Sequence, residues 1–152
     1  VKRDGMQVRI HPAVMVLTRS YRTTLKELHQ FTHVSQELYA EAAGKALVSG
    51  PVYWVYRGAD GHPDTLFTLD IALPIQGFFN TEKSTIRELP AFKAVICRHE
   101  GPWEQLPFTY EKIMEFVEKY KIPIRDECRE LYINVDFQQP SNNITEVQVG
   151  VV

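Results

Sequence analysis

The sequence predicts an α+β fold made of two similar strand–helix–strand–strand units. The same order of elements can be traced twice along the 152 residues. An offset of 79 residues relates the earlier elements of the two halves, placing Val16 on Val95 and Tyr53 on Tyr132, and an offset of 76 relates their last strands, placing Asp70 on Glu146. With 44% hydrophobic and 24% charged residues, the composition is that of an ordinary globular domain. A chain of this length can bury roughly 70% of its surface. We therefore expect a single domain over residues 1–152, with repeat halves of about 12–75 and 91–151.

The first half reads as a strand, a helix and a hairpin. The apolar run at residues 14–17, behind Pro12, is long enough for a buried strand and too short for a helix. Apolar residues at helical spacing start at Leu25, behind two threonines that can cap a helix. We expect this helix to run to about Ala46. A hairpin follows, made of two strands and the Gly- and Asp-rich turn between them: residues 52–56, 58–64 and 66–73.

The second half repeats this order after a connector at residues 74–90, which is too short to link independent domains. Apolar residues at helical spacing from Leu106 to Tyr120 predict a helix, which Pro123 closes. The same signals as in the first half predict the remaining elements: strands at residues 94–97, 131–135 and 144–151, and a turn at residues 139–143.

Two such units predict a pseudo-twofold arrangement in which related strands lie side by side and a crevice separates the halves. Internal interfaces of this kind often hold small-molecule pockets. The repeat therefore indicates where a site would lie, and the residues must indicate its chemistry.

Glu146 is the first candidate site residue, because it interrupts an apolar strand. Alternation places Val147 and Val149 on one face and Glu146 with Gln148 on the other. Asp70 occupies the matching position in the first half. Either acid can lie on an ordinary solvated face, or it can face the crevice, where lost hydration favours a cationic partner.

Aromatic residues are the second feature and make up 11% of the chain. Most are expected in the core, and a helical stripe that contains Tyr110 is more often packing than a ligand contact. Several other rings fall at strand or helix-start positions beside the expected crevice: Tyr53, Trp54, Trp103, Phe108 and Tyr132. An acid beneath aromatic rings attracts organic cations, and each ring contributes about 0.5 to 2 kcal/mol. We therefore expect a ligand site formed by these rings, Tyr110 and the two acids.

Charge and composition argue against several classes of function. The net charge is -2 and the basic residues form no run, so we expect no direct contact with nucleic acid. No apolar stretch approaches the roughly 20 residues that cross a bilayer, and two cysteines are too few for a disulfide framework. We expect a soluble, cytoplasmic protein that does not contact a membrane. The sequence contains no P-loop, dinucleotide or G-x-S-x-G motif, and we expect no cofactor.

Two residue pairs carry weak signals for chemistry. His29 and His33 stand four apart on the first helix, a spacing that can chelate a metal. No third ligand accompanies them, so we expect a solvated helix face and no metal. Cys97 and His99 share one face of a strand about 7 Å apart, which is too far for a direct hydrogen bond unless the side chains converge.

Four segments of the second half resemble the GyrI-like (gyrase-inhibitor-like) domain, the effector-binding module of AraC-type and multidrug-responsive transcription regulators. They are the strand end at 98–103, the helix at 110–120, the phrase at 128–133 and the terminal strand at 144–149. The resemblance covers about residues 12–151. It implies a duplicated fold with a curved antiparallel sheet, two main helices and a central ligand groove.

The resemblance also implies roles for individual residues. Glu146, in the family's terminal Thr-Glu strand, would be the acid at the base of the pocket, and Tyr132, in its Glu-x-Tyr strand, would be a pocket wall. Trp103 stands where the family often has Tyr, and Gly150 stands where a Pro is frequent. No helix-turn-helix segment is found, so we do not expect a complete DNA-binding regulator.

These observations leave three hypotheses for the function. The leading one is a stand-alone module that binds lipophilic cationic or amphipathic compounds. The second, implied by hydrolases in the same family, is hydrolysis of strained alkylating natural products, with Glu146 activating water and Tyr132 as proton donor or hydrogen-bonding partner. The third is a protein-interaction role, with gyrase or a separate DNA-binding regulator as the partner.

Overall fold

A computed structural model describes residues 2–3 and 5–152. The chain divides into two compact units. The first unit is Ala13–Pro90, and the second combines Ala91–Val152 with Val1–Pro12. Each unit carries one α-helix against an antiparallel sheet, so the α+β class that the sequence predicts is confirmed. None of the helices that the structure describes is both long and apolar enough to span a membrane.

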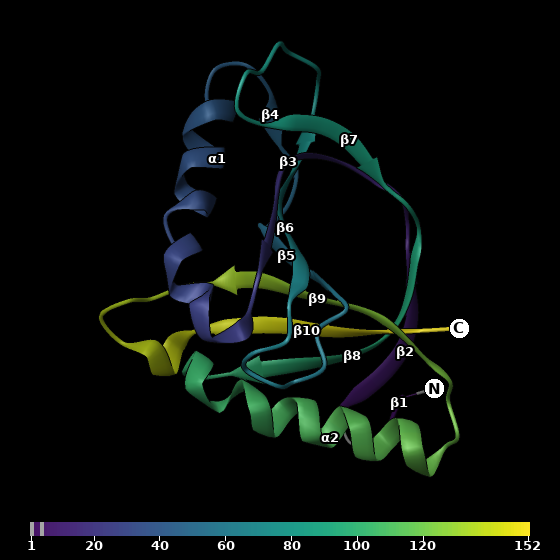
Figure 1. Ribbon diagram of the computed structural model, residues 1–152. Helices are drawn as coiled ribbons and strands as arrows, with labels where there is room; N and C mark the ends of the chain where they lie inside the picture. The colour runs from purple at the N-terminus through teal and green to yellow at the C-terminus, as the bar shows by residue number, and fades with distance from the viewer. Residues whose placement is uncertain (1, 4) are drawn as a thin grey trace. The chain divides into compact units, whose positions relative to one another are not determined.

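The first unit has the strand order β5-β6-β3-β7 (Figure 1). Its helix α1 follows β3 along the chain, and the short strand β4 pairs with β6. The bounds of its elements are β3 (Val14–Thr23), a 3-10 helix (Leu25–Phe31), α1 (Val34–Ala42), β4 (Leu47–Val48), β5 (Tyr53–Arg57), β6 (Phe67–Gln76) and β7 (Thr85–Leu89).

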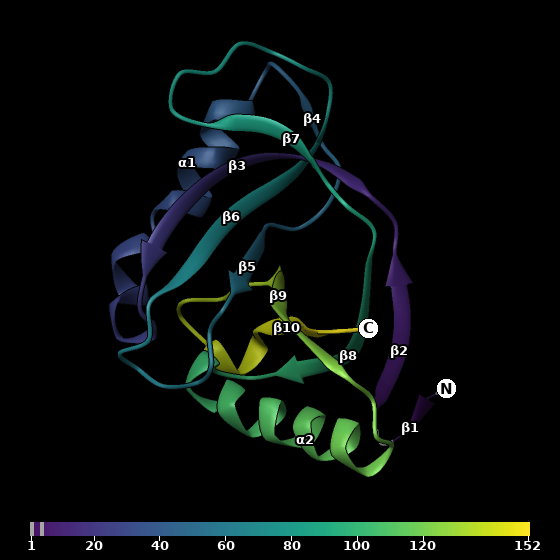
Figure 2. The ribbon, with the colours of Figure 1, turned by 45° about the vertical axis from the view of Figure 1, so that its right-hand side comes forward.

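The second unit has the strand order β1-β2-β8-β10-β9, with helix α2 packed along its sheet (Figure 2). The bounds of its elements are β1 (Lys2–Arg3), β2 (Met6–His11), β8 (Phe92–Glu100), a 3-10 helix (Trp103–Gln105), α2 (Leu106–Lys119), β9 (Ile124–Asn134), a 3-10 helix (Pro140–Asn142) and β10 (Ile144–Val151). In both units the order strand, helix, strand, strand is the one expected from the sequence.

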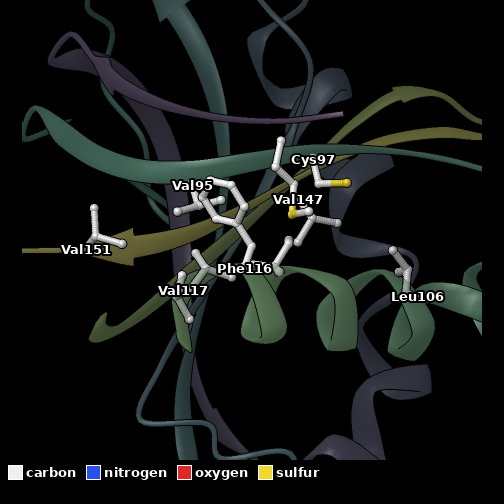
Figure 3. Packing of buried hydrophobic residues seen from close by; sticks show 10 residues of the cluster. Val95, Cys97, Leu106, Phe116, Val117, Val147 and Val151 are labelled. Carbon is white, nitrogen blue, oxygen red and sulfur yellow. The ribbon is translucent and has the colours of Figure 1, made fainter. Parts of the chain in front are cut away.

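The core of the second unit lies between α2 and one face of its sheet. Val95 on β8 and Val147 on β10 are fully buried against Ile113 and Phe116 of α2 (Figure 3). The predicted alternation of β10 is confirmed, because Val147 and Val149 belong to this core. Residues of β9 that pair with these core residues face α2 as well.

Strand register corrects the match between the two halves. Val16 packs on the face of its sheet away from α1, together with Val55, whereas Val95 packs against α2. An offset of 79, which relates Val16 to Val95, therefore joins opposite faces. Arg19 on β3 pairs with Ile71 on β6, and Cys97 on β8 pairs with Val147 on β10. Ile71 and Val147 correspond at the offset of 76, so their partners Arg19 and Cys97 correspond as well, and the offset between β3 and β8 is 78.

The long first helix expected from Leu25 to about Ala46 is wrong. The chain forms a 3-10 helix over Leu25–Phe31, none of whose residues is buried, and then α1. Apolar residues in the first segment recur every third position, which suits the three residues per turn of a 3-10 helix. Val34, Leu38 and Ala42 recur every fourth position and form the buried face of α1.

Four of the described strands were not expected from the sequence: the two-residue strands β1 and β4 and the longer strands β2 and β7. β7 lies within the segment taken as a connector, and β2 precedes Pro12. β7 is the outer strand of its sheet and carries Arg87 and Glu88, which is typical of edge strands that avoid pairing with other chains. In β2 the apolar residues Met6, Val8 and Ile10 do alternate, so a strand signal was present there.

Candidate functional site

A buried carboxylate with two tyrosine hydroxyls is the most distinctive polar feature of the second unit. Glu130 on β9 is 6% exposed. The Tyr110 hydroxyl donates to its Oε2 atom and the Tyr132 hydroxyl donates to its Oε1 atom, each at 2.5 Å. Hydrogen bonds of this length to an ionised acceptor belong to the strong class. Each carboxylate oxygen therefore has a phenol donor of its own.

Strand register explains why these three side chains meet. Glu130 pairs with Val147 and Tyr132 pairs with Thr145, so both lie on the α2 side of the sheet. They are two residues apart, as side chains on one face of a strand must be. Tyr110 reaches them from the first turns of α2, next to the buried residue Ile113.

Aromatic rings flank the carboxylate. The ring of Trp103 contacts that of Tyr132 edge-on, with centroids 5.5 Å apart, and also contacts Phe137 at 6.0 Å. Trp103, Tyr110 and Tyr132 are each half-buried, while Phe137 is 72% exposed. We call Glu130, Tyr110, Tyr132 and Trp103 the Glu130 cluster.

Two buried polar atoms, one in the cluster and one beside it, have no hydrogen-bond partner among the described residues. They are the indole Nε1 of Trp103 and the hydroxyl of Thr145, the residue that pairs with Tyr132. Buried polar groups in proteins are nearly always satisfied, and exceptions often mark a water or ligand position. The α2 side of the sheet at this point therefore offers a donor and a hydroxyl in addition to the carboxylate.

Phe108 does not join the cluster. It is 65% exposed on α2. Two residues along an α-helix turn the side chain by roughly 200°, so Phe108 points away from the side that Tyr110 occupies.

Glu146 lies on the opposite face of the same sheet. It alternates with Val147, which packs against α2, and its half-buried carboxylate accepts a hydrogen bond from the Gln148 amide at 2.7 Å. The structure therefore does not bring Glu146 together with Tyr132, Trp103 and Tyr110, the rings expected around it.

Trp54 and Tyr53 take opposite faces of the sheet in the first unit. Trp54 is 7% exposed and its indole Nε1 donates to the hydroxyl of Ser35 on α1 at 3.1 Å. Tyr53 packs beside Val55 and Ala72, on the face away from α1. The expected correspondence of Tyr53 with Tyr132 is wrong, because Tyr132 faces the helix of its unit and Tyr53 does not.

Asp70 is held inside a structural ion network of the first unit. Its side chain is 1% exposed and accepts hydrogen bonds from Ser20 at 2.5 Å, from Arg87 at 2.7 Å and from Arg57. A buried carboxylate requires such partners, because its desolvation is costly. The cationic partners expected for Asp70 are thus side chains of its own unit.

The residue pairs with weak signals have structural roles. His99 is buried and bridges α2 to the preceding loop, with Nδ1 2.7 Å from the Thr109 hydroxyl and Nε2 2.9 Å from the Pro102 carbonyl. A carbonyl can only accept, so Nε2 is the donor in the second contact. Burial raises the pKa of Cys97, which makes it a poor nucleophile. His33 pairs with Glu37 at 3.3 Å, and no group of three metal-ligating side chains occurs among the described residues.

Glu130 was missed by the sequence-based reasoning. The strand was expected to begin at Leu131, whereas β9 begins at Ile124 and includes Glu130 within its length. The Glu-x-Tyr spacing of Glu130 and Tyr132 was the available signal, because it places an acid and a phenol on one face of a strand.

The fold is that of a known class of small-molecule-binding domains. The profile of the GyrI-like small molecule binding domain matches residues 11–152, and the chain belongs to this family. A comparison with curated proteins gave no significant match.

Solved structures with the same fold include a protein bound to tetraphenylphosphonium and a protein described as a hydrolase. The C-terminal domain of EcmrR is 18% identical with a TM-score of 0.82, covering 97% of this chain and 96% of that one. SAV2435 bound to tetraphenylphosphonium is 15% identical with a TM-score of 0.64, covering 97% and 93%. A hydrolase from Listeria innocua is 15% identical with a TM-score of 0.68, covering 100% and 94%. At these identities the likeness establishes the fold.

Proposed function

We propose that this chain binds lipophilic cationic or amphipathic compounds at the Glu130 cluster. The observation that carries the proposal is the buried Glu130 carboxylate, held by two phenol donors beside an indole ring. The two phenol donors fix the orientation of the carboxylate beside the rings. A carboxylate next to aromatic faces favours an organic cation over a neutral or anionic compound.

The magnitudes are sufficient for micromolar binding. A micromolar dissociation constant corresponds to about 8 kcal/mol. Ring contacts contribute about 0.5 to 2 kcal/mol each to a bound cation, and the cluster supplies the rings of Trp103, Tyr110 and Tyr132. Burial of the ligand's apolar surface and the ion pair with Glu130 supply the rest. The unpartnered Nε1 of Trp103 adds a donor for a polar group of the ligand.

One related structure supports the choice of ligand class. SAV2435 was solved with tetraphenylphosphonium, which is a permanent cation surrounded by four aromatic rings. We therefore use this compound as the probe, because its charge does not vary with pH and its rings can stack on those of the cluster.

The test is calorimetric titration of the 152-residue chain with tetraphenylphosphonium, using two matched variants. Glu130→Gln keeps the shape of the side chain and an oxygen acceptor for a phenol but removes the charge. We expect it to weaken binding at least tenfold. Glu146→Gln makes the same change on the other face of the sheet, and we expect wild-type affinity.

The two variants separate the competing assignments of the acid. Equal affinity of Glu130→Gln and the wild type would overturn the proposal. Loss of binding only in Glu146→Gln would show that Glu146, as expected from the sequence, is the acid that binds the cation. A neutral triaryl compound of similar size, titrated in parallel, shows how much of the affinity depends on the ligand's charge.

A second candidate function, hydrolysis, is favoured by the Tyr–Glu contact itself. A carboxylate and a phenol O–H within hydrogen-bond distance form an acid–base pair, and a solved structure with this fold is described as a hydrolase. With a strained cyclic electrophile as substrate, Glu130 would take a proton from a water molecule as the water oxygen attacks a carbon of the strained ring. Tyr132 would donate its proton to the atom that leaves as the ring opens.

Turnover distinguishes an enzyme from a binding module. The chain is incubated with a strained electrophile, such as an epoxide with an aromatic substituent, and the water adduct is followed by mass spectrometry. Catalysis predicts a product that is lost in both Glu130→Gln and Tyr132→Phe. Binding of tetraphenylphosphonium without turnover of such compounds supports the binding module.

A further inference from the structure

The first unit contains a second candidate site, a groove of about 290 Å³ at the outer edge of its sheet. It opens where the pairing of β3 with β7 ends, at the pair Thr18 and Thr85. Both views in Figures 1 and 2 show β7 alongside β3 at this edge. The groove is lined by Thr18, Arg19, Ser20, Tyr21, Lys83, Thr85 and Arg87. Every one of these side chains carries a hydrogen-bond donor and none is acidic.

The arginines of the groove are held in place by acids that lie behind them. Arg19 donates hydrogen bonds to Glu37, to Glu41 and to the Ser84 hydroxyl, and these three bonds fix the orientation of its guanidinium. The Nη2 atom of Arg87 donates a hydrogen bond to Asp70 at 2.7 Å, and the Arg87 side chain is 39% exposed. Because a guanidinium has five N–H donors, Arg87 keeps others for a ligand.

Some hydroxyls of the groove donate hydrogen bonds within the protein, and Thr85 is exposed. Thr18 donates to the carbonyl of Ile71 and Ser20 donates to Asp70, so their protons point into the protein. Thr85 and Lys83 are exposed, and no ion pair of Lys83 is found among the described residues. The donors that remain for a ligand therefore include Lys83, which lies two residues before β7, and Thr85 and Arg87, which lie within it.

We propose that this groove binds the anionic group of a small molecule: a phosphate, a sulfate or a carboxylate. Two cations and a hydroxyl that line one groove match the several oxygens of such a group, and a guanidinium fixed by Asp70 is already oriented. The volume is near the lower limit of small-molecule pockets, which suits a compact anion. The site differs in charge preference from the Glu130 cluster and does not depend on the function proposed for it.

The test measures anion binding by amide NMR at low ionic strength. The 152-residue chain is titrated in separate arms with inorganic phosphate, sulfate and acetate, and with chloride as the reference anion. We expect saturable, millimolar binding of at least one oxyanion, with shifts centred on residues 18–21 and 83–87. Chloride should give smaller shifts that do not saturate.

Matched charge removals identify the site. Lys83→Gln removes one exposed positive charge at the groove, and Lys112→Gln removes one from the exposed face of α2 in the other unit. We expect Lys83→Gln and Thr85→Val to weaken oxyanion binding at least threefold and Lys112→Gln to leave it unchanged. Arg87→Lys, which keeps a cation near Asp70, should weaken binding too and serves as the variant that preserves the fold.

Three outcomes would overturn the proposal. They are the absence of saturable binding in every oxyanion arm, equal affinity of Lys83→Gln and Lys112→Gln, and shifts centred outside the groove. Preference for phosphate or sulfate over acetate would identify the tetrahedral anions as the ligand class, and the reverse order would identify carboxylates.

Discussion

Removing one phenol oxygen from the Glu130 cluster should cost measurable stability. Tyr132→Phe and Tyr110→Phe each delete a hydroxyl that donates to Glu130 at 2.5 Å and leave the ring in place. A hydrogen bond to a charged group contributes about 1.5 to 3 kcal/mol when buried. Both tyrosines are half-buried, so we expect each variant to lower the free energy of unfolding by about 1 to 2 kcal/mol.

Removing both hydroxyls should lower the free energy of unfolding by more than the sum of the two single losses. Each single variant leaves Glu130 with the other phenol, whereas the double variant removes both of these donors from a side chain that is 6% exposed. Groups in one hydrogen-bond network typically couple by about 0.5 to 3 kcal/mol. The double variant should therefore be destabilised beyond the two single effects.

Urea unfolding followed by tryptophan fluorescence measures these differences, because Trp103 contacts Tyr132 and reports on the cluster. Tyr120→Phe is the control, since Tyr120 is 42% exposed at the end of α2 and its ring contact with Phe116 survives the change. We expect the control to stay within about 0.5 kcal/mol of the wild type. If Tyr110→Phe and Tyr132→Phe behave like the control, the two bonds to Glu130 do not form in solution.

Three further predictions concern packing, thiol reactivity and pH. Gly150→Ala should cost about 1 to 3 kcal/mol in urea unfolding, because its Cβ would lie 2.7 Å from the Glu127 carbonyl; Gly50→Ala, which meets only ordinary contacts at 3.6 Å, should not. Burial raises the pKa of Cys128 to about 12, so native protein at pH 8 should react with a thiol reagent far more slowly than urea-unfolded protein. Burial also lowers the pKa of His11 below 6.5, so the unfolded chain binds the proton more readily. Stability should therefore fall as pH drops below 6.5, and less so in His11→Leu; a parallel pH profile of the two proteins would contradict this.

The order of elements could be predicted because strong local signals mark it. The apolar stripe of α2 and the alternation in β10 reflect burial on one face, and periodicity records that directly. The strands β7 and β9 were missed or shortened because they are rich in charged residues. Their place in the sheet is determined by pairing with distant strands, which no local window of the sequence contains.

The grouping of an acid with aromatic rings could be predicted from the sequence, but not which acid lies beside the rings. An acid among aromatic rings was expected, and three of the expected rings, those of Trp103, Tyr110 and Tyr132, do lie together. The acid beside them is Glu130, because the face of a strand is decided by register and a shift of one residue reverses it. Glu146 differs from Val147 by one position and lies on the opposite face for this reason.

Register also shows how the two units differ where they correspond. Trp54 pairs with Ile71 and Glu130 pairs with Val147, and both pairs are related by the same offset of 76 residues. One structural position therefore carries an indole in the first unit and a carboxylate in the second. In the first unit the indole donates to Ser35 of the helix, and in the second unit the carboxylate accepts from a tyrosine of the helix. The direction of the strand-to-helix hydrogen bond is reversed, and a negative charge is present at only one of the two positions. A repeated fold thus supplies two equivalent positions facing a helix, and the cation site that we propose depends on the exchange of a donor for an acceptor at one of them.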